Sequence, residues 1–404
     1  MVKLFHDNNT VGIYIHFPFC VSKCIYCDFY SVPINKFEAI RSKYTKYLIR
    51  EFSLFRRYIS NFSKTITLYI GGGSPNLLTL SELEQIFHVL YNEFGLNVNS
   101  EISIELNPVD IDSELLRKYR EFGINRLSFG FQSFNDELLK FLKRRNRSRD
   151  NIIALNKARD LGFGNINVDL IFGISGQSLE DFKRDIKEIL IIKPEHISLY
   201  NLIYEENTEL MRMSKTGIIK HVSEEIEFKM YEYAHNILTE NGYEHYEISN
   251  FSKPGYQCLH NLNYWNRGYY IGFGPSAHSF FKNRRWSNLT DIRKYMKMID
   301  KNRLPIENEY CIGEKDKIKE MVMLKLRLKD GLKLSSLKEI VKNREDIIDK
   351  IIHDVSSKYR KYIILDGENF KINVKGWFIL NSIIADIFYI IDEFYEEIGI
   401  SELS

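Results

Sequence analysis

Residues 12–27 read Gly-Ile-Tyr-Ile-His-Phe-Pro-Phe-Cys-Val-Ser-Lys-Cys-Ile-Tyr-Cys, and three of the chain's five cysteines fall in the last eight of these positions. The apolar run before the cysteines indicates a buried strand that Pro18 ends, so the cysteines are expected in the loop at its C-terminal end. Thiolates with this spacing can converge on one metal centre, and cuboidal iron–sulfur clusters are held by such thiolates. The spacing therefore favours a cluster on Cys20, Cys24 and Cys27, with one iron left open.

Two other uses of these cysteines stay open. A structural zinc site takes four ligands, usually as two pairs, and the next cysteine after this loop is Cys258. A disulfide framework is typical of small secreted chains, and this chain is long. Zinc is therefore the second choice from spacing, and a disulfide pair is the third.

The composition predicts a globular protein without a polyanionic partner. The chain has 404 residues, 44% of them hydrophobic, which is enough for one large domain and a smaller one. Its 56 Lys and Arg nearly balance 54 Asp and Glu, so we expect a small-molecule or protein partner and no nucleic acid. No apolar run is long enough for a membrane span and no signal pattern precedes the cysteines, so a soluble, cytoplasmic protein is expected.

Strand and helix patterns alternate through the first half of the chain. Apolar, β-branched runs are separated by segments with helical periodicity, which predicts a parallel sheet with right-handed crossovers. An open doubly wound sheet and a curved partial barrel both satisfy this alternation. The predicted strands after the first are Thr65 to Ile70, Glu101 to Leu106, Arg126 to Phe131, Ile166 to Ile171 and His196 to Leu202.

The last third of the chain reads differently. Helical segments from about Leu289 onward precede a predicted hairpin at Lys361 to Val374, with Asp366-Gly367 at its turn. Helices followed by a hairpin predict a small α+β, winged-helix-like domain. We expect it to contact a protein or to act as a lid rather than to bind DNA, because no concentrated basic helix is present. The predicted domains are therefore residues 1–288 and 289–404.

Polar residues and glycines recur where the predicted strands stop. Gly71-Gly72-Gly73-Ser74 follows the second strand, and three glycines allow the backbone to approach a ligand closely. Glu105, Gln132 and Asp169 end the next three strands. A capping or turn role is as good an explanation for any one of them, but together they indicate a ligand site.

A second group of chemically versatile residues lies between Tyr243 and His278. Three histidines, one cysteine and several aromatic residues occur there, which suits a flat aromatic macrocycle held by an axial ligand. The alternative is a packed loop whose histidines bond to the backbone, and we prefer that alternative for His245 and His278.

The cysteine loop resembles that of the radical S-adenosylmethionine (SAM) superfamily, in its branch related to oxygen-independent coproporphyrinogen III oxidase. The similarity rests on Tyr-Ile-His-Phe-Pro-Phe-Cys20, on the aromatic residue before Cys27 and on Asp28-Phe29 after it, and it extends over nearly the whole chain. It implies a (β/α)6 partial barrel and a [4Fe-4S] cluster whose open iron binds SAM. It further implies these SAM or cluster neighbours: Tyr14, Tyr26, Gly72, Gly73, Ser74, Glu105, Gln132, Arg144 and Asp169.

The segment His260-Asn-x-x-Tyr-Trp265 is similar to a motif of heme chaperones within this branch, which implies heme at His260, with Cys258 as a second candidate. The implied function is to bind heme and pass it to an acceptor protein, with a membrane-bound respiratory protein as the candidate acceptor. The alternative is oxidative decarboxylation of coproporphyrinogen III to protoporphyrinogen IX in porphyrin biosynthesis. Asp28-Phe29 and the short stretch before Cys20 depart from the decarboxylase pattern, so the chaperone is favoured. Whether the chain is an enzyme at all, and whether it forms a homodimer, stays open.

Overall fold

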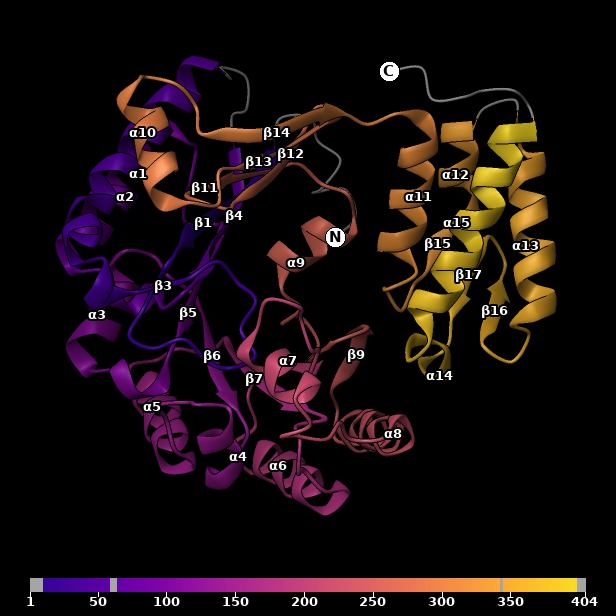
Figure 1. The fold of residues 1–404 in the computed structure, drawn as a ribbon, viewed down its shortest axis with the longest axis horizontal. Coiled ribbons are helices and arrows are strands. Elements are labelled where there is room, and N and C mark those ends of the chain that lie inside the picture. The colour runs from indigo at the N-terminus through magenta and orange to yellow at the C-terminus, as the bar shows by residue number, and fades with distance from the viewer. Residues whose placement is uncertain (1–9, 59–63, 342–343, 398–404) are drawn as a thin grey trace.

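The fold is built on one curved sheet with helices on its outer side (Figure 1). The structure is a computed structural model that describes residues 10–58, 64–341 and 344–397. Six neighbouring strands of the sheet are parallel: β1 (Thr10–Phe17), β4 (Lys64–Gly72), β5 (Glu101–Leu106), β6 (Arg126–Gln132), β7 (Ile166–Phe172) and β8 (His196–Asn201). The predicted series of parallel strands is confirmed.

Each crossover between these strands contains a helix. The helices are α1 (Glu38–Tyr58), α2 (Leu80–Glu93), α3 (Ser113–Glu121), α4 (Asp136–Phe141), α5 (Ser148–Asp160) and α6 (Leu179–Ile192). Local sequence sets where they begin: Thr79 caps α2 through a reciprocal pair of hydrogen bonds with Glu82, and Ser178 does the same for α6 with Asp181. The helices lie along the convex side of the sheet in Figure 1, which leaves its concave side for a site.

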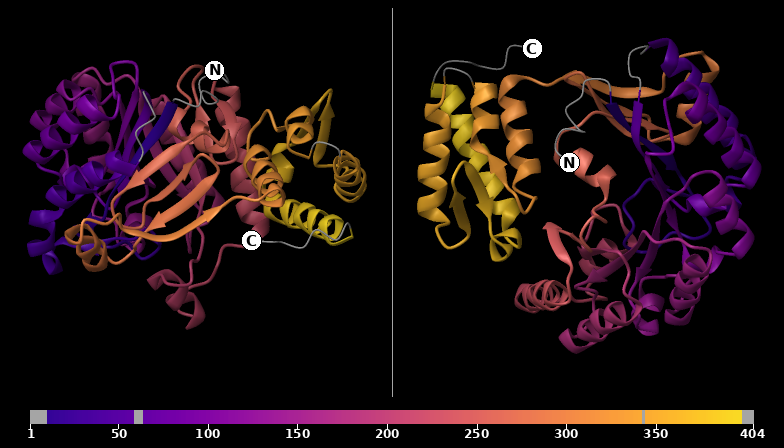
Figure 2. Two further views of the ribbon diagram at one scale, coloured as in Figure 1. Left: turned by 90° about the horizontal axis from the view of Figure 1, so that it is seen from above. Right: turned by 180° about the vertical axis from the view of Figure 1, so that it is seen from behind.

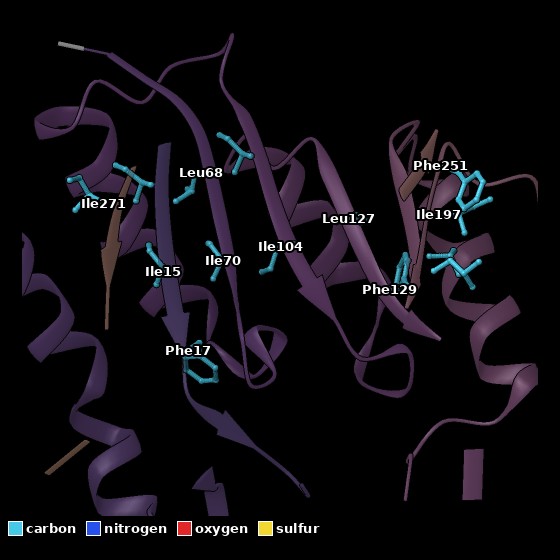
Figure 3. Packing of buried hydrophobic residues seen from close by; sticks show 14 of the residues in the cluster. Ile15, Phe17, Leu68, Ile70, Ile104, Leu127, Phe129, Ile197, Phe251 and Ile271 are labelled. Carbon is cyan, nitrogen blue, oxygen red and sulfur yellow. The ribbon is translucent and has the colours of Figure 1, made fainter. Parts of the chain in front are cut away.

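The core lies between the sheet and these helices. Ile15, Ile70, Ile104 and Leu127 are aligned across four neighbouring strands and are fully buried (Figure 3). Because successive side chains of a strand point to opposite faces, the residues that alternate with this row point to the concave side. Tyr14, Tyr69 and Ser103 form one such inward row, and the inner face is therefore polar and aromatic.

Additional strands extend both edges of the parallel core, and the sequence patterns did not predict them. At one edge β11 (Tyr270–Phe273) lies parallel to β1, and the antiparallel strands β12 (His278–Phe281), β13 (Arg284–Asn288) and β14 (Ile306–Cys311) follow. At the other edge lie β10 (Asn250–Ser252) and β9 (Glu244–Glu247). The connecting helices are α7 (Glu209–Lys215), α8 (Glu224–Glu240), α9 (Leu259–Trp265) and α10 (Ile292–Asp300).

The C-terminal part is a separate helical layer around a three-stranded sheet, on the side away from α1 and α2 (Figure 2). Its elements are α11 (Glu314–Lys325), β15 (Leu332–Lys333), α12 (Leu334–Val341), α13 (Asp346–Lys358), β16 (Ile363–Asp366), β17 (Asn369–Ile372), α14 (Val374–Trp377) and α15 (Leu380–Glu397). The predicted hairpin is β16–β17. Helices together with this hairpin give the α+β, winged-helix-like arrangement expected from the sequence.

Backbone pairing joins this part to the edge of the large sheet. Glu247 of β9 forms an isolated bridge with Leu328, and Ile248 N donates to Arg327 O at 2.9 Å. Trp377 packs its ring 4.9 Å from that of His245. Among the described residues, no helix is long and apolar enough to cross a bilayer.

Candidate functional site

A cavity of about 960 Å³ fills the concave side of the sheet. Ligand sites of this size are typical, and in folds of parallel strands they lie where the strands end. Every residue that the sequence singled out for a site lines this one cavity: Tyr14, Cys20, Cys24, Tyr26, Cys27, Gly72, Gly73, Ser74, Glu105, Gln132, Arg144, Asp169, Cys258 and His260. The tertiary structure thus brings together residues from almost the entire first two-thirds of the chain.

The cysteine loop lies at the C-terminal end of β1. Cys20 ends the short strand β2 (Phe19–Cys20), which pairs with β3 (Val32–Pro33), and all three loop cysteines are free thiols. Burial, followed by the charge of Cys24, raises the pKa of the Cys27 thiol to about 11. Metals bind the thiolate, so the positive charge of a bound metal group would favour the deprotonated form of Cys27.

The arrangement of the thiols bears on the zinc alternative. Within the described ranges, no three His, Cys, Asp or Glu side chains converge as ligands of a single metal ion would. A tetrahedral zinc site needs such convergence, whereas a cluster of four irons receives each thiolate at a separate iron. The donor set of three soft sulfurs without a fourth ligand therefore fits a cluster better than zinc.

The glycine loop lies directly beside the cysteine loop, because Phe17 and Gly72 are aligned across β1 and β4. Gly73 N donates to Phe17 O at 2.6 Å, and Ser74 N donates to Phe19 O at 2.8 Å. A Cβ atom on Gly73 would lie 2.5 Å from Phe19 O, and Gly72 has a φ of +109°. No other residue fits these two positions without strain, so the loop requires glycine.

Two buried carboxylates lie on the inner face near the glycine loop. Glu105 accepts hydrogen bonds from Gly72 N and from the Tyr69 hydroxyl, both at 3.0 Å. Burial, with the nearby charge of Asp169, raises the pKa of Glu105 to about 7, and burial also raises the pKa of Asp169. Two neighbouring carboxylates with raised pKa values are stabilised by a cation, and the ammonium and sulfonium groups of SAM, which the family resemblance implies, are cations.

Arg144 reaches the cavity from the far side of the cysteine loop. Its guanidinium donates to Gly130 O at 2.6 Å and to Asn146 Oδ1 at 3.0 Å, and it lies 3.6 Å from the Cys24 sulfur. A guanidinium in this position can bind a carboxylate with two parallel hydrogen bonds. Gln132 lies nearby at a bulge of β6, where its φ of +71° turns the strand end toward the cavity.

The two tyrosines expected beside the cluster also lie in the cavity. Tyr14 stacks on Tyr69 at 6.3 Å, and its hydroxyl bonds to His16 Nδ1 at 3.0 Å. Tyr26 precedes Cys27 in the loop, and its ring is buried against Cys24 and Arg144, whose charges act on its hydroxyl.

His260 lies at the opposite end of the cavity, near the N-terminal ends of the strands. It is 1% exposed, its Nδ1 bonds to Thr67 Oγ1 at 2.8 Å, and its Nε2 bonds to the Tyr264 hydroxyl at 2.8 Å. Burial, with the charge of Arg126, lowers the pKa of His260 to about 3. Both ring nitrogens are therefore occupied in this conformation, and neither is free to bind iron.

Cys258 is the other heme-ligand candidate from the sequence, and its thiol also contacts a protein side chain. Its thiol lies 3.7 Å from Glu101 Oε1, and burial raises its pKa to about 12. Glu101 also accepts from His260 N and Leu259 N, both at 3.0 Å, so this carboxylate caps α9 and fixes it against the sheet.

Sequence reasoning missed a set of inward residues. Arg126, Ser128, Asn167 and Ser198 line the cavity, and Arg126 is the largest fully buried side chain of the described residues. They are polar residues that alternate with apolar ones along β6, β7 and β8. This period of two, read strand by strand, is the signal that could have found them.

Comparisons with known proteins agree with this architecture. The family model described as the radical SAM superfamily matches residues 14–189. The chain is 36% identical over 327 residues to the heme chaperone HemW of Lactococcus lactis, covering 79% of this chain and 82% of the relative. It is 32% identical over 352 residues to HemW of Bacillus subtilis, covering 85% and 91%.

One solved structure superposes on nearly the whole chain. Coproporphyrinogen III oxidase (HemN) from Escherichia coli matches with a TM-score of 0.81 over 97% of this chain and 92% of that one, at 22% identity. At this sequence identity the match supports a statement about the fold only. It confirms the radical SAM partial barrel over the open doubly wound sheet.

Proposed function

Because this chain belongs to the HemW family of heme chaperones within the radical SAM superfamily, we propose that it binds heme and transfers it to an acceptor protein. The observation that carries this proposal is the similarity to HemW proteins over most of both chains, at 31–36% identity in eight relatives. The match to the decarboxylase is weaker in sequence and supports no activity.

The cofactors are a [4Fe-4S] cluster and SAM. When bound, the cluster supplies an open iron and electrons. We propose that Cys20, Cys24 and Cys27 hold it, since they form a soft donor set with no fourth ligand at the mouth of the cavity. The neighbouring glycine loop presents only backbone at this end of the cavity, because a Cβ atom on Gly72 or Gly73 would clash with neighbouring atoms. This leaves an approach to that iron that no side chain blocks.

The polar inner face suits SAM. Glu105 and Asp169 are buried carboxylates that a bound ammonium or ribose group would satisfy, and Arg144 provides the guanidinium for a carboxylate. Gln132 and Ser74 add an amide and a hydroxyl at the same end of the strands. We propose these residues, with Tyr14, Tyr26, Gly72 and Gly73, as the SAM site.

Heme transfer is tested with the full chain after anaerobic reconstitution of the cluster. Heme-loaded protein is mixed with membranes that contain the apo form of a heme-dependent respiratory oxidase, and oxidase activity is followed. We expect faster recovery than with the same concentration of free heme. No advantage over free heme would count against the chaperone.

The enzyme alternative is tested in parallel. Protein, SAM, reductant and coproporphyrinogen III are incubated without oxygen, and we expect no protoporphyrinogen IX. Multiple turnovers of that product would replace our proposal by the decarboxylase. A variant with Cys20, Cys24 and Cys27 changed to Ala is the control, because it lacks the cluster ligands in both assays.

The organisation of the chain is also a proposal. The sequence predicts a division into residues 1–288 and 289–404, of which 1–9, 59–63, 342–343 and 398–404 lie outside the described residues. Since α10 and β14 pack with the large sheet, we propose a junction closer to Gly313. The cytoplasmic location, the membrane-bound respiratory acceptor and a homodimer stay predictions.

A further inference from the structure

Three histidines line the cavity, and two of them have no free ring nitrogen. His16 bonds through Nδ1 to the Tyr14 hydroxyl at 3.0 Å and through Nε2 to Tyr30 O at 2.8 Å. His260 is saturated in the same way by Thr67 and Tyr264. For either residue to ligate iron, a buried hydrogen bond would have to break and its partner would lose its acceptor or donor.

His278 differs from both. It begins β12, its side chain is exposed to the cavity, and within the described part of the chain it makes no hydrogen bond. Partial burial and the positive charge of Arg285 lower its pKa, so the ring is neutral at neutral pH. A neutral imidazole with a free nitrogen is the form that binds metal.

Strand register shows where this side chain points. Tyr270 pairs with Phe280 across β11 and β12, so His278 lies level with Gly272, which in turn pairs with Tyr14 on β1. Residues that are level on neighbouring strands point to the same face. The side chain of His278 lines the cavity together with that of Tyr14, and the position between them requires glycine, because a Cβ atom on Gly272 would lie 2.3 Å from His278 O.

The surroundings of His278 suit a flat, anionic ring system. Tyr264 and Tyr270 meet edge to face at 4.5 Å, and Tyr270 also contacts Phe280. Such aromatic faces cover large apolar areas at low entropic cost. The group therefore provides an apolar wall beside the only cavity histidine of the described chain that has a free nitrogen.

The same wall carries a surplus positive charge. Arg285 and Arg267 both bind the single carboxylate of Glu320, and Arg285 also donates to the Tyr270 hydroxyl at 2.9 Å. Two guanidinium groups on one carboxylate leave one positive charge uncompensated. The propionate groups of heme are anions that such a site attracts.

We infer that His278, and not His260, is the side chain of this cavity that ligates the iron of heme. The inference rests on the proposed heme binding and names the ligand within it. His260 instead positions α9: its bond to Thr67 attaches that helix to β4, and its bond to Tyr264 fixes an aromatic side chain of the same helix, so its loss disturbs the wall of the site without removing the iron ligand.

The test is a titration of ferric heme into the full-length protein, followed by the Soret band and by EPR. Wild type is compared with His278→Ala, His278→Met and His260→Ala, and with His353→Ala, which removes an exposed histidine on α13. Iron content of the cluster and circular dichroism confirm that each variant is folded. Because His278 makes no hydrogen bond, its variants are expected to fold.

We expect His278→Ala to bind heme at least about tenfold more weakly and with a shifted Soret band, and added imidazole to restore the wild-type spectrum. His278→Met should give a different EPR signal. His260→Ala should keep the wild-type spectrum even where its affinity falls. If His278→Ala keeps the wild-type affinity and spectrum, His278 is not the ligand, whereas failure of wild type to bind heme refutes the proposed function itself.

Discussion

Replacing Gly73 by alanine should weaken SAM binding because the new methyl group meets backbone atoms on the strand before the cysteines. Its Cβ would lie 2.5 Å from Phe19 O and 2.9 Å from Phe17 O. Ordinary carbon–oxygen contacts are about 3.3 Å or longer, so one of the two loops must move by roughly 0.8 Å. Both oxygens also accept hydrogen bonds from the glycine loop, which prevents an easy shift.

The cost follows from this clash. Overpacking at a site without flexible neighbours costs about 1–3 kcal/mol, which corresponds to about 5- to 150-fold in affinity. The assay is calorimetric titration of SAM into anaerobically reconstituted Gly73→Ala, together with its iron content. We expect weaker SAM binding in either case. If the cysteine loop is the one that moves, we also expect incomplete loading of the cluster iron.

Gly164→Ala is the matched control. A Cβ at Gly164 meets no atom within 4 Å, so this variant should bind SAM as wild type does. Should Gly73→Ala bind SAM with wild-type affinity and full iron content, the two loops do not form the SAM approach that we propose.

Three further outcomes follow from the structure. Arg144→Lys should lower SAM affinity about tenfold with the iron content unchanged, because lysine keeps the charge but loses the fork that meets Cys24 and a ligand carboxylate; unaltered SAM affinity would argue against this role. Burial raises the pKa of Glu51 to about 7, above its unfolded value of about 4.3, so the folded state binds the extra proton and stability should fall by up to about 3 kcal/mol as pH rises from 4 to 8; urea unfolding of Glu51→Gln across this range should have a smaller pH slope, and an equal slope would contradict the assignment. Trp377→Ala should cost about 3–5 kcal/mol of unfolding free energy, since the buried indole donates to Leu326 O within the C-terminal part and packs against His245 of the large sheet; a loss under 1 kcal/mol would show that these contacts contribute little.

Local sequence determined the elements of the barrel. The predicted strand Glu101 to Leu106 is found at those residues, and a helix lies in each crossover where helical periodicity was expected. Hydrophobic periodicity and caps act over a few residues, so they can be read without the fold. The short edge strands β9 to β14 were not predicted, because strands of three to six residues carry too little periodic pattern and depend on their neighbours for pairing.

The position of the site was also available from the sequence. Cys20, Gly73, Glu105, Gln132 and Asp169 stand at the ends of the first five predicted strands, and parallel strands bring their carboxyl ends to one edge. In the structure these residues line one cavity, and their roles toward a ligand stay a prediction.

Only the tertiary structure decided which histidine is free. By motif, His260 was the expected iron ligand and His278 a packed loop residue, yet His260 is the saturated one. Its partner Thr67 lies 193 residues away, and the Arg126 charge that acts on it comes from another strand. Hydrogen-bond partners across a sheet are set by register and helix docking, which no local pattern specifies, so the availability of a ring nitrogen is a property of the fold.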